Sequence, residues 1–454
     1  MRFSNYNILS EQLNNGEYLL LNGLTGTLDL IDEEAYALIT ANSKENILPA
    51  TVINQLAGVC EHFVERGYLT ELSADEELLK AETLAFDLLE KQEQEKWTVV
   101  ILPSLECNYR CTYCFEQNTG YPAQTMSKKQ ADAIFEIIKG KTASGARITL
   151  YGGEPLAKKN REIIEYIVEK GKELGCHFFA VTNGHDLDHY IDLLGEDGIR
   201  GVQISMDGPR DIHNRRRISL DNVSSYDKIL ANIEKVLQDT TAAVYLRINL
   251  DKRNAPYAMD FLEDLEKRGL LDNPAVNVAA NQVTGSGDLT LINDEMRVLE
   301  KTAGAKYPRL KEMFSGRSQA GNDSFFPALY VGEPVVRRVS FCGASGNMKL
   351  FCPDGKIYAC WAGLGRSDQV IGTFDEAGHI DWNTETLEAW KRTTLPYNRE
   401  CLRCKFAFLC AGGCCKPVLP KETAAANDEC DYYKHTFESY LAGIANEYLA
   451  VGNE

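Results

Sequence analysis

Three cysteines near residue 110 have the residue type and the spacing that could bind a metal cluster. Cys107, Cys111 and Cys114 form a C-x3-C-x2-C pattern within the stretch ECNYRCTYCFE. A structural zinc site is closed by four protein ligands, and the next histidine along the chain is as far away as His177. A 4Fe–4S cluster has four irons, so three thiolates would leave one iron open to a further ligand. The triad therefore predicts an iron–sulfur cluster at which a further ligand can bind and react.

A second group of cysteines fills the last quarter of the chain. After Cys342 come twelve residues, Gly355, four more residues and Cys360. After a gap of forty residues the pattern continues as Cys401-x2-Cys404-x5-Cys410-x3-Cys414, and Cys430 follows after fifteen more residues. No secretory signal accompanies these thiols, so metal ligation explains them better than disulfides do.

Length, charge and hydropathy indicate how many domains the chain forms and argue against nucleic acid and membranes as partners. A chain of 454 residues usually forms two to three domains. A net charge of −18 argues against nucleic acid, because phosphate backbones require cationic patches, and NRRR (214–217) is only one short basic cluster. No apolar run approaches the ~18 residues of a membrane span, and MRFSNYNILSEQ is too polar for a signal peptide. We therefore expect a cytoplasmic protein with neither a nucleic-acid nor a membrane partner.

Strand patterns alternate with helical patterns between residues 97 and 305, which predicts a parallel sheet with crossover helices. The expected strands are WTVVILPSL, RITLYGG, HFFAVTNG, GVQISMDG, AVYLRINLD and AVNVAANQV. The cysteine triad follows the first strand and YGGEP ends the second. Functional groups of such folds gather at the carboxyl ends of the strands, so we expect these motifs to meet there.

Other patterns flank this region. Residues 1–73 read as a strand, a turn, a strand and two helices, the second over 49–67, and residues 74–96 as a connecting helix. Residues 306–340 are expected to bridge to a cysteine-rich domain over 341–454, which contains a hairpin at LFCPDGKIYAC and a closing helix.

The order C-x3-C-x2-C, YGGEP, SMDGP resembles the radical S-adenosylmethionine (SAM) enzymes over residues 97–305. The resemblance implies an α/β fold with a partial (β/α)6 barrel. It also implies that the amino and carboxylate groups of SAM chelate the open iron, and that reductive cleavage gives a 5′-deoxyadenosyl radical. The SAM contacts that it implies are Tyr113 at the adenine, Gly152, Gly153 and Glu154 at the amino group, Ser205 and Asp207 near the ribose, and Arg247 at the carboxylate, with Asn183 as a further candidate. Ordinary strand-end capping is the alternative for Asn183, Ser205, Asp207 and Arg247.

The C-terminal spacing resembles the SPASM extension of that family, which holds two auxiliary 4Fe–4S clusters and would bring the total to three. The resemblance assigns Cys342, Cys360 and Cys414 to the first auxiliary cluster, and Cys401, Cys404, Cys410 and Cys430 to the second. Cys352 is the candidate fourth ligand of the first. If CPDGK is a three-residue turn with a left-handed Gly355, however, Cys360 lies roughly 13 Å farther along the strand. A substrate thiolate at an open corner therefore remains the alternative.

Residues 1–73 resemble the PqqD-like, winged-helix-like α+β domain that captures the leader of a precursor peptide as an added edge strand; a purely structural wing is the alternative. Together the resemblances imply an anaerobic radical SAM oxidoreductase of the ranthipeptide or sactipeptide type. Such an enzyme forms thioether crosslinks in a ribosomally synthesised peptide, with a flavodoxin- or ferredoxin-type protein as the reductant.

Three other functions compete with thioether formation. An anaerobic sulfatase maturase would make formylglycine, but those enzymes carry an Asp directly after the cysteine that corresponds to Cys360, and this chain has Trp361. A maturase that forms carbon–carbon crosslinks or epimerises residues is the second alternative. An iron–sulfur electron carrier is the third, and YGGEP and SMDGP argue against it because a carrier needs no SAM pocket.

Overall fold

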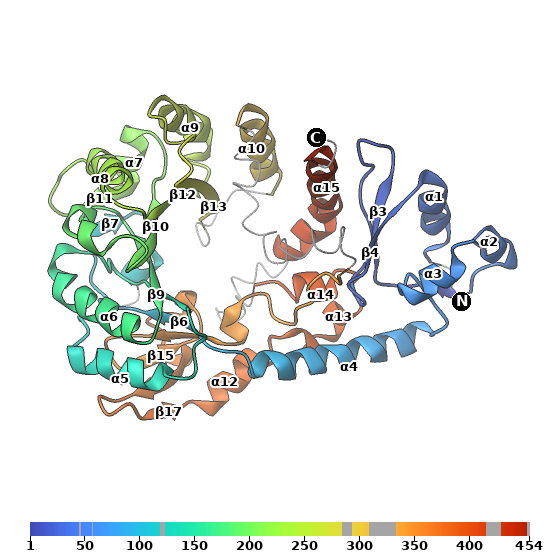
Figure 1. Cartoon of the computed structure of the whole chain (residues 1–454), viewed down its shortest axis with the longest axis horizontal. Coiled ribbons are helices and arrows are strands. Elements are labelled where there is room, and N and C mark those ends of the chain that lie inside the picture. Colours follow the sequence, from blue (N-terminus) through green and yellow to red (C-terminus); the bar gives the residue numbers. More distant parts are fainter. Residues whose placement is uncertain are drawn as a thin grey trace. The chain divides into compact units, whose positions relative to one another are not determined.

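The computed structural model describes residues 1–44, 47–56, 58–118, 123–283, 293–307, 333–414 and 428–451. Its chain forms two compact units (Figure 1). Unit 1 contains Met1–Gln94, Arg317–Gly346 and Ala389–Glu454, and unit 2 contains Glu95–Gly316 and Asn347–Glu388. Most of the expected bridging region 306–340 lies outside the described residues. No helix in the described part of the chain is long and apolar enough to cross a membrane.

Unit 2 is built on a ten-stranded sheet with the order β13-β12-β10-β9-β8-β6-β14-β15-β16-β17. All six strands predicted from the sequence form, and each is parallel to its neighbour. Their carboxyl ends therefore lie at one edge of the sheet. These strands are β6 (Thr98–Ile101), β8 (Arg147–Leu150), β9 (His177–Thr182), β10 (Ile199–Ser205), β12 (Ala243–Leu250) and β13 (Val276–Gln282).

Amphipathic helices connect most of these strands, as the alternating pattern requires. They are α5 (Lys128–Ile138), α6 (Arg161–Glu173), α7 (Arg210–Arg216), α8 (Ser225–Asp239) and α9 (Ala258–Lys267), and α10 (Asn293–Lys306) follows the last strand. The connection between β9 and β10 instead uses two short 3-10 turns, η3 (Leu187–His189) and η4 (Ile191–Leu193). One face of the sheet is covered by apolar side chains such as Val99, Ile148 and Phe178, which are almost fully buried.

Part of the predicted C-terminal region joins the same sheet. Strand β14 (Met348–Phe351) pairs in parallel with β6, and β15 (Lys356–Tyr358), β16 (Val370–Phe374) and β17 (Ile380–Trp382) continue it in antiparallel fashion. The CPDGK turn has the expected geometry, because Gly355 has a φ of 78° and the amide of Cys352 donates to the carbonyl of Lys356 at 3.0 Å. The C-terminal end of this hairpin carries Cys360.

Unit 1 contains a three-stranded antiparallel sheet of β2 (Asn7–Leu9), β3 (Tyr18–Asn22) and β4 (Leu28–Ile31). Its helices are α1 (Glu33–Asn42), α2 (Ala50–Gln55) and α3 (Cys60–Glu65), and β1 (Arg2–Phe3) pairs with β5 (Leu69–Thr70). This arrangement is winged-helix-like, as predicted. The single helix expected over 49–67 is wrong: two short helices form there, with Gly58, a poor helix former, between them.

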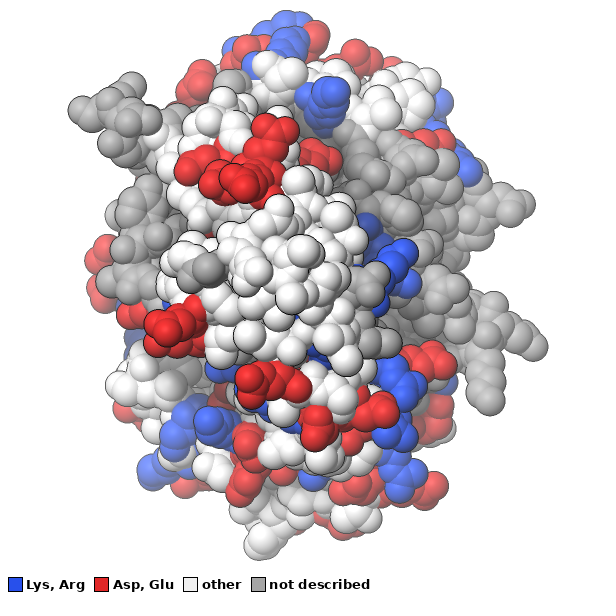
Figure 2. All heavy atoms as spheres, turned by 90° about the vertical axis from the view of Figure 1, so that its right-hand side faces the viewer, with Lys and Arg blue, Asp and Glu red and all other residues white. Residues whose placement is uncertain are grey.

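The same small sheet also packs against C-terminal helices. Helix α4 (Ala74–Glu93) begins with a capping box between Ser73 and Glu76, and near the C-terminus lie α13 (Arg399–Leu402), α14 (Ala407–Cys410) and α15 (Asp428–Val451). One core joins strand residues such as Leu19 and Leu21 to Leu409, Phe437 and Leu441. Among the described residues visible in Figure 2, charged side chains of both signs border a broad uncharged area.

Candidate active site

The cysteine triad follows β6, at the carboxyl edge of the parallel strands. Cys111 ends the short strand β7 (Tyr109–Cys111), which pairs with β11 (Arg217–Ser219). The pKa of the Cys107 thiol is raised to about 12 by burial, with smaller contributions from the negative charges of Glu154, Cys111 and Cys114. The three thiols are therefore close enough to interact with one another.

The three thiols of the triad are donors of the type that binds iron–sulfur clusters. No group of three or more His, Cys, Asp or Glu side chains in the described part of the chain could hold one metal ion. A four-iron cluster is bound at separate corners, so its thiolates need not converge on one point.

The YGGEP turn presses against the residue that precedes the triad. Gly153 has a φ of 48°, and a Cβ atom there would lie 2.3 Å from the carbonyl oxygen of Glu106. That same oxygen accepts a hydrogen bond from the amide of Glu154 at 2.8 Å. Only glycine fits this position without displacing the loop that carries Cys107.

The Glu154 carboxylate ties two strand ends together. It accepts hydrogen bonds from the Thr182 hydroxyl at 2.5 Å, from the amide of Asn183 at 2.6 Å and from the amide of Leu156 at 2.9 Å. Burial raises the pKa of this carboxyl to about 7, and the three donors oppose that shift. The geometry therefore gives the side chain a bracing role, and its contact with SAM stays a prediction.

Asn183 belongs to the same hydrogen-bonded network as Glu154. Its side-chain amide donates to Asn108 Oδ1 at 2.6 Å, and its Oδ1 accepts from the amide of His185 at 2.9 Å. Because Asn108 lies inside the triad loop, Asn183 fixes that loop to the end of β9. Its role as a SAM contact also stays a prediction.

Tyr113 and Asp207 form a buried polar cluster beside the triad. The Tyr113 hydroxyl accepts from Arg217 Nη1 at 2.7 Å and from Asn249 Nδ2 at 3.2 Å. Asp207 is fully buried and accepts from Arg216 Nε at 3.3 Å and from Asn249 Nδ2 at 3.3 Å. These bonds fix the orientation of the Tyr113 ring, as a platform for an adenine would require.

Ser205 and Arg247 are neighbours across β10 and β12, both half-buried. The buried Nε of Arg247 has no hydrogen-bond partner within the described residues. A buried unpaired donor is costly, so the atom is suited to an anionic group. This orphaned donor fits the carboxylate of SAM.

The sequence analysis missed Arg217, which is buried and stands directly opposite Cys111 in the β7–β11 pair. Its Nη1 donates to Tyr113, while its Nε has no hydrogen-bond partner among the described residues. It is therefore a second candidate for the SAM carboxylate. The NRRR cluster contained the signal, but it was considered only as a basic cluster for nucleic acid, which overlooked that Arg217 begins a strand.

Glu116, Tyr151 and Trp361 were also missed. Glu116 accepts a hydrogen bond from the amide of Gly153 at 2.7 Å and another from Tyr151, and burial raises the pKa of its carboxyl. Trp361 stacks on the Tyr151 ring with centroids 5.5 Å apart, and 42% of Trp361 is exposed. The residue after Cys360 is thus placed beside the YGGEP turn.

The four cysteines assigned to the second auxiliary cluster come together within unit 1. The pKa of the Cys410 thiol is raised to about 12 by burial, and negative charge on Cys401, Cys404 and Cys430 adds to the shift. Cys404 and Cys410 also pack against the core that joins the N-terminal sheet to α14 and α15. The cluster itself stays a prediction.

The cysteines assigned to the first auxiliary cluster are divided between the units. Cys342 and Cys414 belong to unit 1, whereas Cys360 and the candidate fourth ligand Cys352 belong to unit 2. Cys352 is fully buried at the end of β14. The composition of this cluster therefore stays a prediction.

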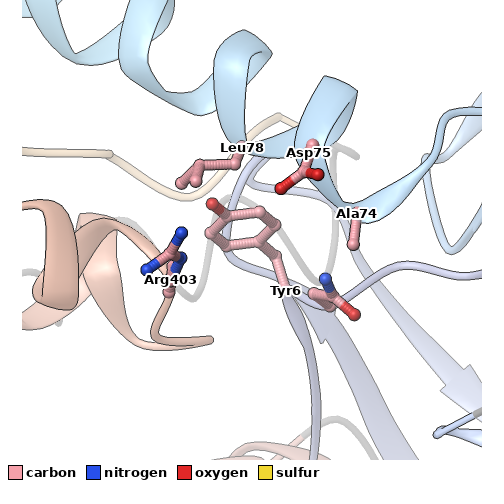
Figure 3. A pocket seen from close by; sticks show the side chains of 6 residues that line it. Tyr6, Ala74, Asp75, Leu78 and Arg403 are labelled. Atoms are coloured by element: carbon pink, nitrogen blue, oxygen red, sulfur yellow. The ribbon is translucent and has the colours of Figure 1, made fainter.

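A separate pocket of about 190 Å³ lies within unit 1 (Figure 3). The Tyr6 ring lies in it between Arg403 and the start of α4, where Asp75 is found. Arg403 is the residue before Cys404, and the Tyr6 hydroxyl donates to the carbonyl of Leu402 at 2.6 Å. The pocket contains none of the predicted SAM contacts, all of which belong to unit 2.

Comparison with known proteins places these features in a family. Residues 101–253 match the model of the radical SAM superfamily. A GTP 3′,8-cyclase of Rhizobium etli (strain CIAT 652) is 32% identical over 284 residues, covering 58% of this chain and 73% of the relative. A cysteine-type anaerobic sulfatase-maturating enzyme of Clostridium novyi (strain NT) is 22% identical over 365 residues, covering 75% and 94%. Native anSMEcpe with bound AdoMet has a TM-score of 0.58 at 18% identity, over 77% of this chain and 99% of that chain, and so shares the fold.

Proposed function

Because the chain belongs to the radical SAM superfamily and is an enzyme of that family, we propose that it matures a ribosomally made peptide by forming Cys-sulfur-to-carbon thioether crosslinks. Membership of this family implies a 4Fe–4S cluster and SAM. The observation that carries the proposal is the stacking of Trp361, the residue after Cys360, on Tyr151 of the YGGEP turn, which itself contacts the loop of the triad. A reacting carbon held at this contact would meet both the SAM site and a residue next to an auxiliary cysteine.

The residues present fit the cofactors. Cys107, Cys111 and Cys114 would hold the cluster, and the close packing of Gly153 against Glu106 holds their loop in place. When bound, the cluster and SAM supply a 5′-deoxyadenosyl radical, which removes a hydrogen atom from a substrate carbon. The unpaired Nε of Arg247 would donate a hydrogen bond to the SAM carboxylate.

The Trp361–Tyr151 stack supports a role in holding the substrate. Trp361 is the exposed member, so its outer face is free to contact a side chain of the peptide and to exclude water from the reacting carbon. Trp361 also offers no carboxylate to act as the base that formylglycine formation would use at this position. The arrangement therefore favours a reaction in which the substrate sulfur is retained.

The two auxiliary clusters belong to the same proposal. Cys401, Cys404, Cys410 and Cys430 would hold one, and Cys342, Cys360 and Cys414 the other, with Cys352 or a substrate thiolate at its remaining corner. A flavodoxin- or ferredoxin-type protein would supply the electron for SAM cleavage.

The N-terminal domain is proposed to bind the leader peptide at β4, which is an edge strand of its sheet. Deleting residues 1–73 would test this poorly, because Leu19 and Leu21 share a core with C-terminal helices. Leu30 of β4 is 41% exposed, so Leu30→Glu should weaken leader binding and leave SAM cleavage unchanged. Leu79→Glu, at an exposed position of α4, is the matched control.

The experiment that tests the function is anaerobic co-expression with the candidate precursor, followed by mass spectrometry. We expect the peptide to lose two hydrogens per crosslink and to keep all its sulfur. The match to a sulfatase-maturating enzyme makes formylglycine formation the second candidate. That reaction would convert a cysteine to an aldehyde with loss of sulfur, which the same spectrum would reveal.

A further inference from the structure

Strand β11 has an inverted pattern of burial. Its polar residues Arg217 and Ser219 are buried, whereas Ile218 is 45% exposed and Leu220, directly after the strand, is 52% exposed. Val223, three residues farther on, is 50% exposed. A strand with one solvated face normally directs its apolar side chains inward, and exposed apolar clusters mark interaction sites. We call Ile218, Leu220 and Val223 the ribbon patch.

The inverted pattern follows from what the inner face of the ribbon does. Arg217 must face inward to reach the Tyr113 hydroxyl, and it stands opposite Cys111. Because side chains alternate along a strand, this register turns Ile218 outward. Ile218 is paired with Arg110, and paired Cα atoms of antiparallel strands are about 5 Å apart. The ribbon patch thus lies on the outer side of the two strands whose inner side faces the triad.

Two arginines lie close to the patch in the chain, Arg110 in β7 and Arg215 in the last turn of α7. Arg110 is exposed, and its Nη1 donates to the carbonyls of Cys107 at 2.9 Å and Tyr109 at 2.8 Å. Arg215, in the last turn of α7, is exposed and donates to the carbonyl of Asp211 at 3.0 Å. Neither arginine forms an ion pair with a described carboxylate.

The loop of the patch contains the acidic residue Asp221, which already interacts with neighbouring side chains. Asp221 accepts a hydrogen bond from Ser219, and its carboxylate lies 3.0 Å from His185 Nε2. Two uncompensated arginines beside an apolar strip stand out in a chain of net charge −18. The surface is complementary to a partner with an apolar contact area and a rim of carboxylates.

We propose that the ribbon patch is the docking surface for an acidic one-electron carrier protein of the flavodoxin or ferredoxin type. The inference rests on the proposed function, because SAM cleavage is the reaction that needs this electron. In this step the reduced carrier would be oxidised by one electron, and the cluster that the triad would hold would be reduced by it; no bond is made or broken.

The position of the patch favours a carrier over the other two occupants, a precursor peptide and a second copy of the chain. A peptide must reach the inner side, where Tyr113 and Arg247 would hold SAM, whereas a carrier needs only to come close to the cluster. A second copy has no need to lie beside the triad, and its binding there would be read out as self-association.

Binding is measured by calorimetry between the reconstituted full-length protein and a purified acidic flavodoxin, and separately a purified ferredoxin. The variants are Ile218→Asp combined with Leu220→Asp, and Arg215→Glu. Val298→Asp is the matched control, because Val298 is an exposed apolar residue of α10. SAM cleavage is measured in parallel with the reduced carrier and with dithionite, a small reductant that needs no docking surface.

We expect the double variant to weaken carrier binding by at least about tenfold, as for the loss of a central interface contact. Carrier-driven SAM cleavage should fall by a similar factor, while dithionite-driven cleavage and the control variant stay at the wild-type level. Arg215→Glu should weaken carrier binding and reduce its dependence on salt. Unchanged carrier binding in both variants would overturn the proposal.

The remaining outcomes also decide the question. If the double variant loses dithionite-driven cleavage as well, Arg215→Glu decides, and equal losses with both reductants would overturn the proposal. Loss of self-association or of precursor binding, with carrier binding intact, would assign the patch to a second copy or to the peptide. A wild-type protein that fails to cleave SAM with dithionite would refute the proposed function, yet the binding measurement would still test the docking surface.

Discussion

Replacing Gly153 by alanine should damage the SAM site in a way that can be estimated from the structure. A left-handed conformation such as the φ of 48° at Gly153 costs an alanine about 1–2 kcal/mol of conformational free energy. The new Cβ would lie 2.3 Å from the Glu106 oxygen, against the 3.0 Å that such contacts need, so the loop must move by about 0.7 Å. That movement stretches the hydrogen bond from the Glu154 amide to the same oxygen, which adds about 0.5–1.5 kcal/mol.

The total cost of Gly153→Ala is about 1.5–3.5 kcal/mol, and it falls on the loop that carries Cys107. If SAM binding requires the native loop, its affinity should fall roughly 10- to 400-fold. Gly175→Ala is the control, because Gly175 has a φ of 70° but open space where its Cβ would go. It should lower thermal stability slightly and leave SAM binding intact. The assays are calorimetric titration with SAM and thermal unfolding; a Gly153→Ala protein that binds SAM as tightly as Gly175→Ala would refute the reasoning.

The remaining predictions concern the carboxyl brace, the triad and the aromatic stack. The pKa of the Glu154 carboxyl is about 7 in the folded protein and about 4.5 in the unfolded chain, so folding favours the protonated carboxyl. Its contribution to the free energy of unfolding is therefore full below about pH 4.5 and is lost as the pH rises to about 7. The stability advantage of the wild type over Glu154→Gln should therefore shrink between these pH values in thermal unfolding; a constant difference would contradict the assignment. Reconstituted protein should contain about twelve irons, and the combined change of Cys107, Cys111 and Cys114 to alanine should remove about four; a wild-type content near four would refute the auxiliary clusters. Trp361→Ala should release more 5′-deoxyadenosine per modified peptide while Trp361→Phe preserves the coupling; an unchanged ratio in Trp361→Ala would remove the stack from substrate positioning.

The sequence predicted well whatever depends on residues close together in the chain. The period of apolar residues located all six parallel strands, and the turn residues Pro353, Asp354 and Gly355 located a hairpin with the expected register. The triad and the YGGEP turn were found at strand ends because local order along the chain fixes that relation. A local signal failed between residues 49 and 67, where the apolar spacing continued across Gly58 although the helix did not.

The sequence did not predict interactions between distant segments, because burial and pairing across long separations leave no local periodicity. The inward turn of Arg217 depends on pairing with β7, about a hundred residues earlier in the chain. The stack of Trp361 on Tyr151 depends on the C-terminal hairpin, whose strand β14 joins the sheet beside β6.

What the sequence by itself determined is the chemistry, because soft thiols at cluster spacing and a glycine turn after a strand are properties of neighbouring residues. What only the tertiary structure decided is which polar groups surround that chemistry. It buried Arg217 and turned Ile218 to solvent, because the pairing of β7 with β11 admits one register. It also joined the N-terminal sheet to the helices that carry Cys410 and Cys430, because apolar faces such as Leu19 and Leu21 are stable only against a partner surface, and that surface lies nearly four hundred residues away in the chain.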